Sequence, residues 1–200
     1  MCPIPAAARP GRPAALSAPA IGGAVMCGGG SRRFGTDKAL VEVDGRVMAD
    51  RVAAVLDAAG CAPVVFVGGA SDRLAAITGR AVVADTWPGE GPLGAVIDAL
   101  RWFGRLDSCG VVVAACDLPD LTVEAVQSVA GDAGTTAVAV AERVHPSLAY
   151  WPTATVHDLE ALFRSGVRAV HEALETLGAT PVAVDAAALH NVNRPSDLGD

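Results

Sequence analysis

Short apolar segments alternate along the chain with segments whose apolar residues recur every three or four positions. The short segments are rich in β-branched residues and lack polar alternation, which is typical of strands covered on both faces of a sheet. They predict strands at 21–27, 63–67, 80–84, 110–115, 136–140 and 181–184. The segments with helical spacing predict helices at about 47–59, 72–78, 92–103, 122–130, 154–164 and 167–177.

This alternation predicts an α/β fold of three layers, in which helices cover both faces of a mainly parallel, Rossmann-like sheet. Ligands of such folds bind beyond the carboxyl ends of the strands, so we expect the functional residues in the loops that follow them. Residues 1–20 are rich in Pro and Ala and are expected to form a disordered extension. Residues 21–200 are expected to form a single domain.

Composition narrows the class of protein further. The chain is 52% hydrophobic and 18% charged, which excludes a mostly disordered protein. A net charge of −7 argues against nucleic acid as a partner, and no apolar run is long enough to span a membrane. Prolines interrupt the N-terminal segment, so it does not resemble a signal peptide, and we expect a cytoplasmic protein with reduced thiols.

A glycine-rich loop follows the first predicted strand, with the sequence CGGGSRRFGTDK at 27–38. Consecutive glycines let backbone N–H groups approach an anion, and Lys38 is the only lysine of the chain. The spacing matches neither the Rossmann fingerprint nor the Walker A motif. The loop therefore indicates a phosphate site of another kind, the alternative being a glycine turn with two solvated arginines.

Carboxylates follow two of the predicted strands. Asp117 comes directly after the apolar run at 110–115, where a carboxylate at the mouth of the sheet can hold Mg²⁺ against substrate phosphates. Asp85 follows the predicted strand at 80–84, although an ordinary turn residue is an alternative there. The only two asparagines of the chain, Asn191 and Asn193, occur together near its end.

The glycine-rich loop resembles the nucleotide-binding signature of the molybdenum cofactor guanylyltransferases, which belong to the GT-A-like nucleotidyltransferases. The family pattern reads roughly L-A-G-G-x-S-R-R-M-G-x-D-K, and VMCGGGSRRFGTDK keeps its spacing. Three further segments are similar to family motifs: ADTWPGEGPLGAV at 84–96, CDLP at 116–119 and HNVNRPSDL at 190–198. The resemblance covers about residues 21–200.

The resemblance implies an enzyme that transfers GMP from GTP to the terminal phosphate of molybdopterin and releases pyrophosphate. It implies catalytic roles for Lys38, Asp117 and Arg33, and a Mg²⁺ cofactor bound by Asp117 and Asn193. The residues implied for GTP binding are Met26, Cys27, Gly28, Gly29, Gly30, Lys38, Gly68, Asp85 and Asp117. Those implied for the acceptor are His145, Arg168 and Asn191.

One departure from the family pattern concerns a nucleotide contact. Gly68 stands where many members have an asparagine that contacts the nucleotide, and this leaves the choice between GTP and CTP open. A molybdopterin cytidylyltransferase, another small-molecule nucleotidyltransferase and a non-catalytic GTP-binding regulator are the alternative interpretations. His145 could equally be a structural residue at the start of a strand. Transient contacts with proteins that make or receive the cofactor are also expected.

Overall fold

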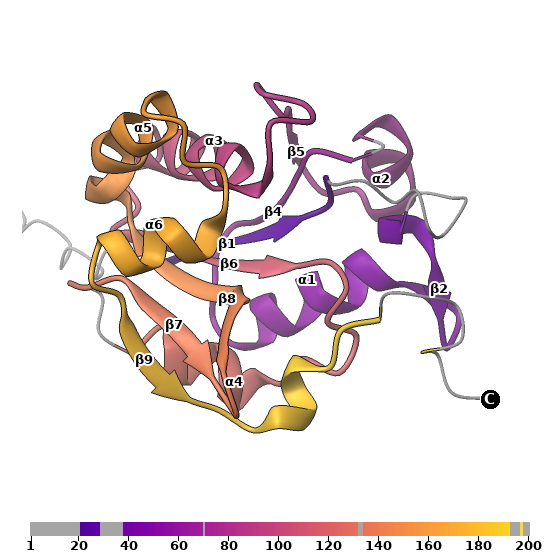
Figure 1. Cartoon of the computed structure of the whole chain (residues 1–200). Helices are drawn as coiled ribbons and strands as arrows, with labels where there is room; N and C mark the ends of the chain where they lie inside the picture. Colours follow the sequence, from indigo (N-terminus) through magenta and orange to yellow (C-terminus); the bar gives the residue numbers. More distant parts are fainter. Residues whose placement is uncertain (1–20, 29–37, 70, 132–133, 193–196, 198–200) are drawn as a thin grey trace, which may run out of the picture.

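A computed structural model of the chain describes residues 21–28, 38–69, 71–131, 134–192 and 197. The expected extension at 1–20 lies outside these residues. At the centre is a seven-stranded sheet with the strand order β5-β4-β1-β6-β8-β7-β9 (Figure 1). Its strands are β1 (Ile21–Met26), β4 (Val64–Val67), β5 (Val82–Val83), β6 (Gly110–Ala115), β7 (Ala137–Val140), β8 (Val144–Pro152) and β9 (Thr180–Ala183).

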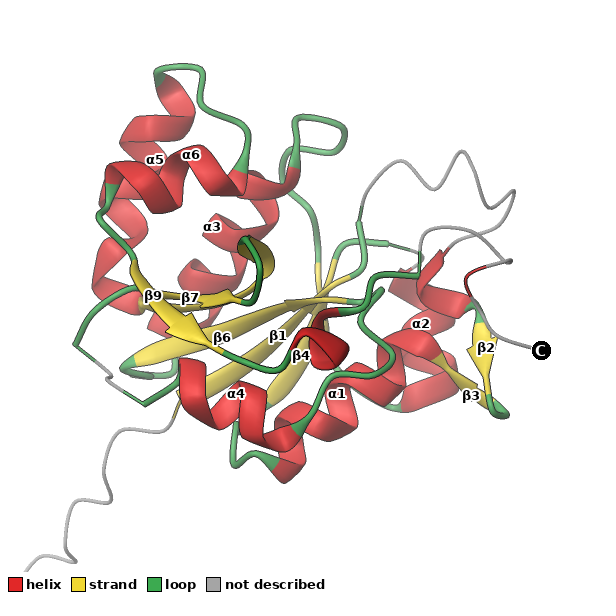
Figure 2. Ribbon diagram, turned by 60° about the horizontal axis from the view of Figure 1, so that its bottom comes forward, coloured by secondary structure: helices red, strands yellow, loops and turns green. Residues whose placement is uncertain are grey.

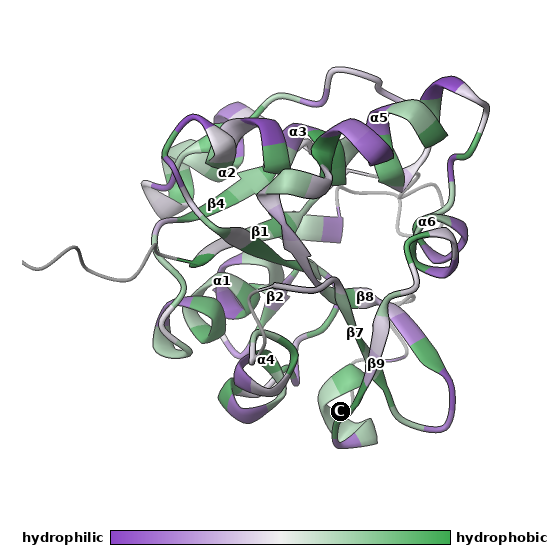
Figure 3. Cartoon of the chain, turned by 90° about the vertical axis from the view of Figure 1, so that its left-hand side faces the viewer, coloured by the Kyte–Doolittle hydropathy of each residue, from purple (hydrophilic) through white to green (hydrophobic). Residues whose placement is uncertain are grey.

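Helices cover both faces of this sheet (Figure 2). The buried residues of α1 (Met48–Ala58), α2 (Ser71–Thr78) and α4 (Val123–Val129) belong to the apolar core on one face. Those of α3 (Pro92–Gly104), α5 (Val156–Arg164) and α6 (Val170–Thr176) belong to the core on the other face. In Figure 3, hydrophobic and hydrophilic residues alternate around α5, as expected of a helix with one buried side. The predicted three-layer α/β fold is thus confirmed.

The sheet is mostly parallel, with one exception that the sequence analysis missed. Strands β5, β4, β1 and β6 run parallel, as do β7 and β9, whereas β8 pairs antiparallel with both β6 and β7. The first residues of β8 are half-buried or exposed, and they include Pro146. They therefore lack the continuous apolar pattern by which buried strands are predicted. A register shift in the β7–β8 pairing, between Val138 and Ala139, lies opposite this half of β8.

A small hairpin also went unpredicted. It consists of β2 (Glu42–Val43) and β3 (Arg46–Val47), joined by Asp44 and Gly45 with φ angles of 50° and 74°. Two residues with positive φ are what a tight two-residue hairpin turn requires. The Asp-Gly pair was therefore a signal for this hairpin in the sequence. The described residues also form three short 3₁₀ turns: η1 (Lys38–Leu40), η2 (Thr153–Thr155) and η3 (Ala186–Leu189).

Most of the described cysteines lie in the core. Cys27, Cys61 and Cys116 are buried and Cys109 is half-buried. Burial, followed by the charge of Asp57, raises the pKa of the Cys61 thiol to about 12. Within the described ranges, no helix combines the length and the apolar character needed to cross a bilayer.

Close approach of α3 to the sheet depends on a glycine in β1. A Cβ atom at Gly22 would lie only 2.0 Å from the ring of Phe103, which is fully buried on α3. We expect Gly22→Ala to lower the free energy of unfolding by about 1–3 kcal/mol, the usual cost of overpacking a core. Urea denaturation of the two proteins tests this, and equal midpoints and slopes would contradict it.

Candidate active site

The carboxyl ends of four neighbouring parallel strands lie at the same edge of the sheet. Beyond the strands themselves, the pairing continues for one further residue in three places: Cys27 N donates to Val67 O at 2.9 Å, Gly68 N to Val83 O at 2.9 Å, and Cys116 N to Met26 O at 3.1 Å. These bonds bring the residues after β5, β4, β1 and β6 together. The structure thus gathers most of the described candidate residues at one edge, as the fold predicts.

Two glycines and one carboxylate form one end of this edge. A Cβ atom at Gly68, which has a φ of 70°, would lie 3.4 Å from the backbone N and Cα of Gly28. The Oδ2 atom of Asp85 lies 3.7 Å from the place that a Cβ atom of Gly28 would occupy. Its other oxygen, Oδ1, accepts a hydrogen bond of 2.9 Å from Trp87 N. An exposed stretch of backbone at Gly28 therefore lies beside a carboxylate, an arrangement that can bind a hydrogen-bonding ligand.

At the other end, Asp117 is the centre of a polar cluster. Its Oδ2 accepts a hydrogen bond of 2.6 Å from Lys38 Nζ, and its Oδ1 accepts one of 3.2 Å from Asn191 Nδ2. The side chains of Lys38 and Asp117 are only 15% and 16% exposed, so solvent screens this ion pair less than a surface pair. Val192 N donates to Asp117 O at 3.0 Å, which ties the C-terminal segment to the loop after β6.

Contacts between distant segments account for this cluster. Lys38 opens η1 and stands 79 residues before Asp117, and Asn191 stands 74 residues after it. The sequence analysis assigned Asn191 to the acceptor, whereas the structure places its amide group on the carboxylate of Asp117. The other predicted members of the site, Gly29, Gly30, Arg33 and Asn193, lie outside the described residues.

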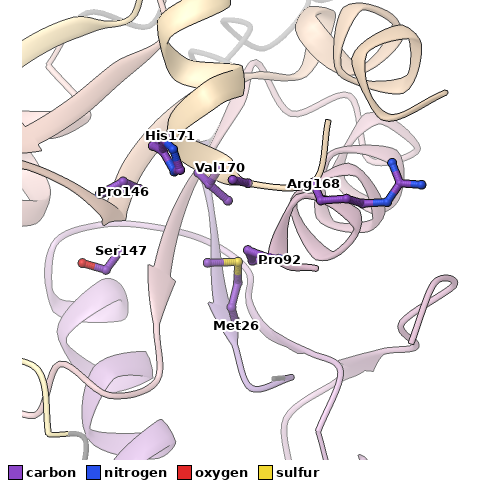
Figure 4. A pocket seen from close by; sticks show the side chains of 8 residues that line it. Met26, Pro92, Pro146, Ser147, Arg168, Val170 and His171 are labelled. Atoms are coloured by element: carbon purple, nitrogen blue, oxygen red, sulfur yellow. The ribbon is translucent and has the colours of Figure 1, made fainter. Parts of the chain in front are cut away.

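A pocket of about 380 Å³ opens at the end of β1 (Figure 4). Met26 at the end of β1, Pro92 at the start of α3 and Val170 at the start of α6 supply apolar walls. Ser147 on β8 and His171 on α6 add two polar side chains. The sequence analysis missed Ser147 and His171, because the pocket is assembled from separate segments that spacing along the chain does not bring together.

Arg168 also lines this pocket, but its guanidinium group points away from it (Figure 4). The group donates to Glu90 Oε2 at 2.9 Å and to the Phe163 carbonyl at 2.6 Å, and it stacks 3.9 Å from the centre of the Phe163 ring. These contacts hold the segment before α3, helix α5 and the segment before α6 together. The observed contacts of Arg168 are therefore structural.

His145 is half-buried on β8, next in sequence to the pocket residues Pro146 and Ser147. Burial, and after it the positive charge of Arg143, lowers the pKa of His145 below its usual value. A lowered pKa means that the imidazole is more often neutral near pH 7, so it can both donate and accept a hydrogen bond.

The donor set at Asp117 fits magnesium rather than a metal held wholly by protein. No group of three or more His, Cys, Asp or Glu side chains that could hold a metal occurs among the described residues. Magnesium typically takes one or two protein carboxylates and completes its shell with water and substrate phosphates. Each oxygen of Asp117 accepts one hydrogen bond, which leaves lone pairs for a cation.

Comparison with known proteins identifies relatives over most of the chain. Residues 23–180 match the family described as the MobA-like NTP transferase domain. The molybdenum cofactor guanylyltransferase of Cereibacter sphaeroides is 34% identical over 181 residues, which cover 88% of this chain and 92% of that protein. The enzyme of the same name from Rhodobacter capsulatus is 30% identical and covers 89% and 93% of the two chains.

Solved structures show the same architecture. The molybdopterin-guanine dinucleotide biosynthesis protein A of Archaeoglobus fulgidus has a TM-score of 0.73 and 25% identity, over 89% of this chain and 95% of that one. The 4-diphosphocytidyl-2C-methyl-D-erythritol synthase of Anaerococcus prevotii has a TM-score of 0.70 at 9% identity, over 90% and 95% of the two chains. The second likeness concerns the fold alone.

Proposed function

Because the chain belongs to the MobA-like NTP transferase family, we propose that it transfers GMP from GTP to the terminal phosphate of molybdopterin and releases pyrophosphate. The product would be the guanine dinucleotide form of the cofactor. The observation that carries the proposal is the Lys38–Asp117–Asn191 cluster at the carboxyl end of β6, in a chain whose full-length relatives are named guanylyltransferases.

The order of the strands supports one orientation of the nucleotide. The strand ends before Asp85 and Asp117 are three strand spacings apart, on the order of 14 Å. That separation suits a nucleoside triphosphate lying across the ends of β4 and β1, with its phosphates at the cations. We therefore assign the base end to Gly68 and Asp85 and the phosphate end to Lys38 and Asp117. Cys27, Gly28, Gly29, Gly30 and Arg33 would contact the nucleotide between and beside these ends.

The reaction needs charge neutralisation more than proton transfer. An oxygen of the molybdopterin phosphate forms a bond to the α-phosphorus of GTP, while the bond from that phosphorus to the α–β bridging oxygen breaks. The bridging oxygen leaves with pyrophosphate. A phosphate monoester is largely ionised near neutral pH, so its oxygen attacks without a general base. Lys38 offsets the repulsion between the two anions by binding the triphosphate.

Asp117, together with Asn193, would hold the Mg²⁺ ion. When bound, Mg²⁺ offsets negative charge on the phosphate oxygens and orients them. The amide of Asn191, which donates to Asp117 Oδ1, fixes the rotation of that carboxylate. Asn191 thus positions the metal ligand, and its contact with the acceptor stays a prediction of the family resemblance.

The pocket between Met26, Pro92 and Val170 is the acceptor site in this proposal. Its apolar walls suit a flat heterocycle such as a pterin, and Ser147 and His171 can hydrogen-bond to the polar edge of the ring. His145 remains a proposed contact from the neighbouring part of β8. Arg168 would shape the wall of the site, because its guanidinium group is bonded to Glu90 and to main-chain carbonyls.

Calorimetry with GTP, CTP and ATP in the presence of Mg²⁺ tests the nucleotide assignment. We expect GTP to bind at least about ten times more tightly than the other two, because a hydrogen bond worth about 1.4 kcal/mol corresponds to a factor of ten in affinity. A preference for CTP would favour a cytidylyltransferase. This alternative stays open because Gly68 has no side chain that could contact the base. Failure of all three nucleotides to bind would contradict the nucleotide site itself.

A further inference from the structure

One carboxylate lies inside the protein, away from the strand-end cluster. Asp98 is in the middle of α3 and is 5% exposed, which makes it the only buried acidic residue in the part of the chain that the structure describes. Its neighbours in the helix, Ile97 and Ala99, are apolar and fully buried. A buried carboxylate destabilises a fold unless it is hydrogen-bonded, so the partner of Asp98 indicates its role.

Both oxygens of Asp98 bind the same residue, Thr86. The backbone N–H of Thr86 donates to Oδ2 at 2.8 Å, and its hydroxyl group donates to Oδ1 at 2.8 Å. Arg101, one helical turn further on, lies 3.8 Å from Oδ1 and adds a compensating positive charge. Two short bonds from a rigid, buried helix fix both the backbone and the side chain of Thr86.

Thr86 stands directly between Asp85 and Trp87. Asp85 Oδ1 accepts the Trp87 N–H, and the Trp87 ring packs 4.9 Å from the ring of Phe163 on α5. Residues 85–87 are therefore anchored to α3 by Asp98 and to α5 by Trp87. On the other side of this anchored segment, Asp85 Oδ2 lies beside the backbone of Gly28.

We propose that Asp98 is a positioning residue for the nucleotide site, and that it acts by holding Thr86 so that Asp85 stays against Gly28. The inference rests on the proposed function, in which Asp85 contacts the base end of GTP. In the proposed orientation Asp98, which is 5% exposed, does not touch the nucleotide and acts on it through Asp85. If Asp98 served stability alone, its replacement would change the melting temperature and leave nucleotide affinity as it is.

The first test compares GTP affinity, measured by calorimetry with Mg²⁺ below the melting temperature of every variant. Asp98→Ala leaves both donors of Thr86 without a partner and is expected to weaken GTP binding about ten-fold. Asp98→Asn keeps an oxygen for the Thr86 N–H and gains an amide that can donate to its hydroxyl oxygen, so its affinity should stay within about two-fold of the wild type. Ile97→Val on the same helix is the control, because it removes core packing and leaves both hydrogen bonds between Asp98 and Thr86 in place.

The second test asks whether Asp98 acts through Asp85. In a double-mutant cycle, Asp98→Ala should weaken binding by less than about two-fold once Asp85 is already Ala, because the side chain that it positions is gone. If the fold-changes of the two single variants multiplied in the double variant, the proposal would be wrong. It would also be wrong if Asp98→Ala bound GTP as tightly as the wild type or as Ile97→Val.

Failure of the proposed function gives a different result from failure of the positioning role. A wild-type protein that prefers CTP would contradict guanylyl transfer, and the cycle would then be run with CTP and judged by the same criteria. A wild-type protein that binds no nucleotide would overturn both. Unchanged affinity in Asp98→Ala, with tight GTP binding by the wild type, would overturn the positioning role alone.

Discussion

Replacing Asp117 with alanine is expected to lower the rate of GMP transfer by about 10³-fold or more, because the metal would lose its carboxylate ligand. Metal stabilisation of charge in a transition state contributes several kcal/mol, and each 1.36 kcal/mol is about a factor of ten in rate. The variant also leaves Lys38 without the carboxylate oxygen that lies 2.6 Å from its Nζ atom. Release of pyrophosphate from GTP in the presence of molybdopterin measures the effect.

Two further variants test whether the loss of activity is specific to the charge of Asp117. Asp117→Asn keeps the shape of the side chain and removes its charge, so it should also be severely impaired while its circular dichroism spectrum stays that of the wild type. Asp120→Asn alters an exposed carboxylate three residues later, which is bonded to His190 at 3.2 Å, and it should keep its activity. If kcat of Asp117→Ala were within ten-fold of the wild-type value, the metal role of Asp117 would be wrong.

Replacing Lys38 with alanine is expected to weaken binding of GTP with Mg²⁺ by about 10- to 100-fold, the range given by losing a hydrogen bond to a charged group. Two effects add in this variant: the cation that would bind the triphosphate is lost, and the carboxylate of Asp117 is left to repel it. The loss of affinity should therefore shrink as the salt concentration rises. Calorimetry over a salt series measures both quantities.

A matched control separates this effect from general loss of positive charge. Arg46→Ala removes a cation from β3 whose partner is Asp50, at 2.6 Å on the surface, and GTP affinity should not change. Equal affinities for the wild type and Lys38→Ala would contradict the role given to this lysine. A Lys38→Arg variant should recover only part of the affinity, because a planar guanidinium group is larger than an ammonium group.

The parallel half of the sheet could be predicted because its strands are short apolar runs, of which β1, β4 and β6 are almost wholly buried. Strand β8 could not, since its first half carries His145, Pro146 and Ser147 and is only partly covered. The three-layer fold nevertheless followed from the alternation of strands and helices, because one additional antiparallel strand does not alter the layers.

The candidate site could be predicted in part, for a similar physical reason. Asp117 and Asp85 follow buried strands, and the carboxyl ends of parallel strands necessarily meet at one edge. The pairing of Asp117 with Lys38 and Asn191 depends on how distant loops fold back, which spacing along the chain does not encode. Asp98 was missed because α3 reads as an apolar helix; the single acid among its buried positions was the available signal.

Turnover with the acceptor tests the central claim most directly. The purified protein is incubated with molybdopterin, Mg²⁺ and either GTP or CTP, and the dinucleotide products and pyrophosphate are measured by chromatography and mass spectrometry. We predict the guanine dinucleotide and pyrophosphate in equal amounts with GTP, and little product with CTP or with the Asp117→Ala variant. A protein that binds GTP but forms no guanine dinucleotide, or that forms the cytosine dinucleotide instead, would contradict this account.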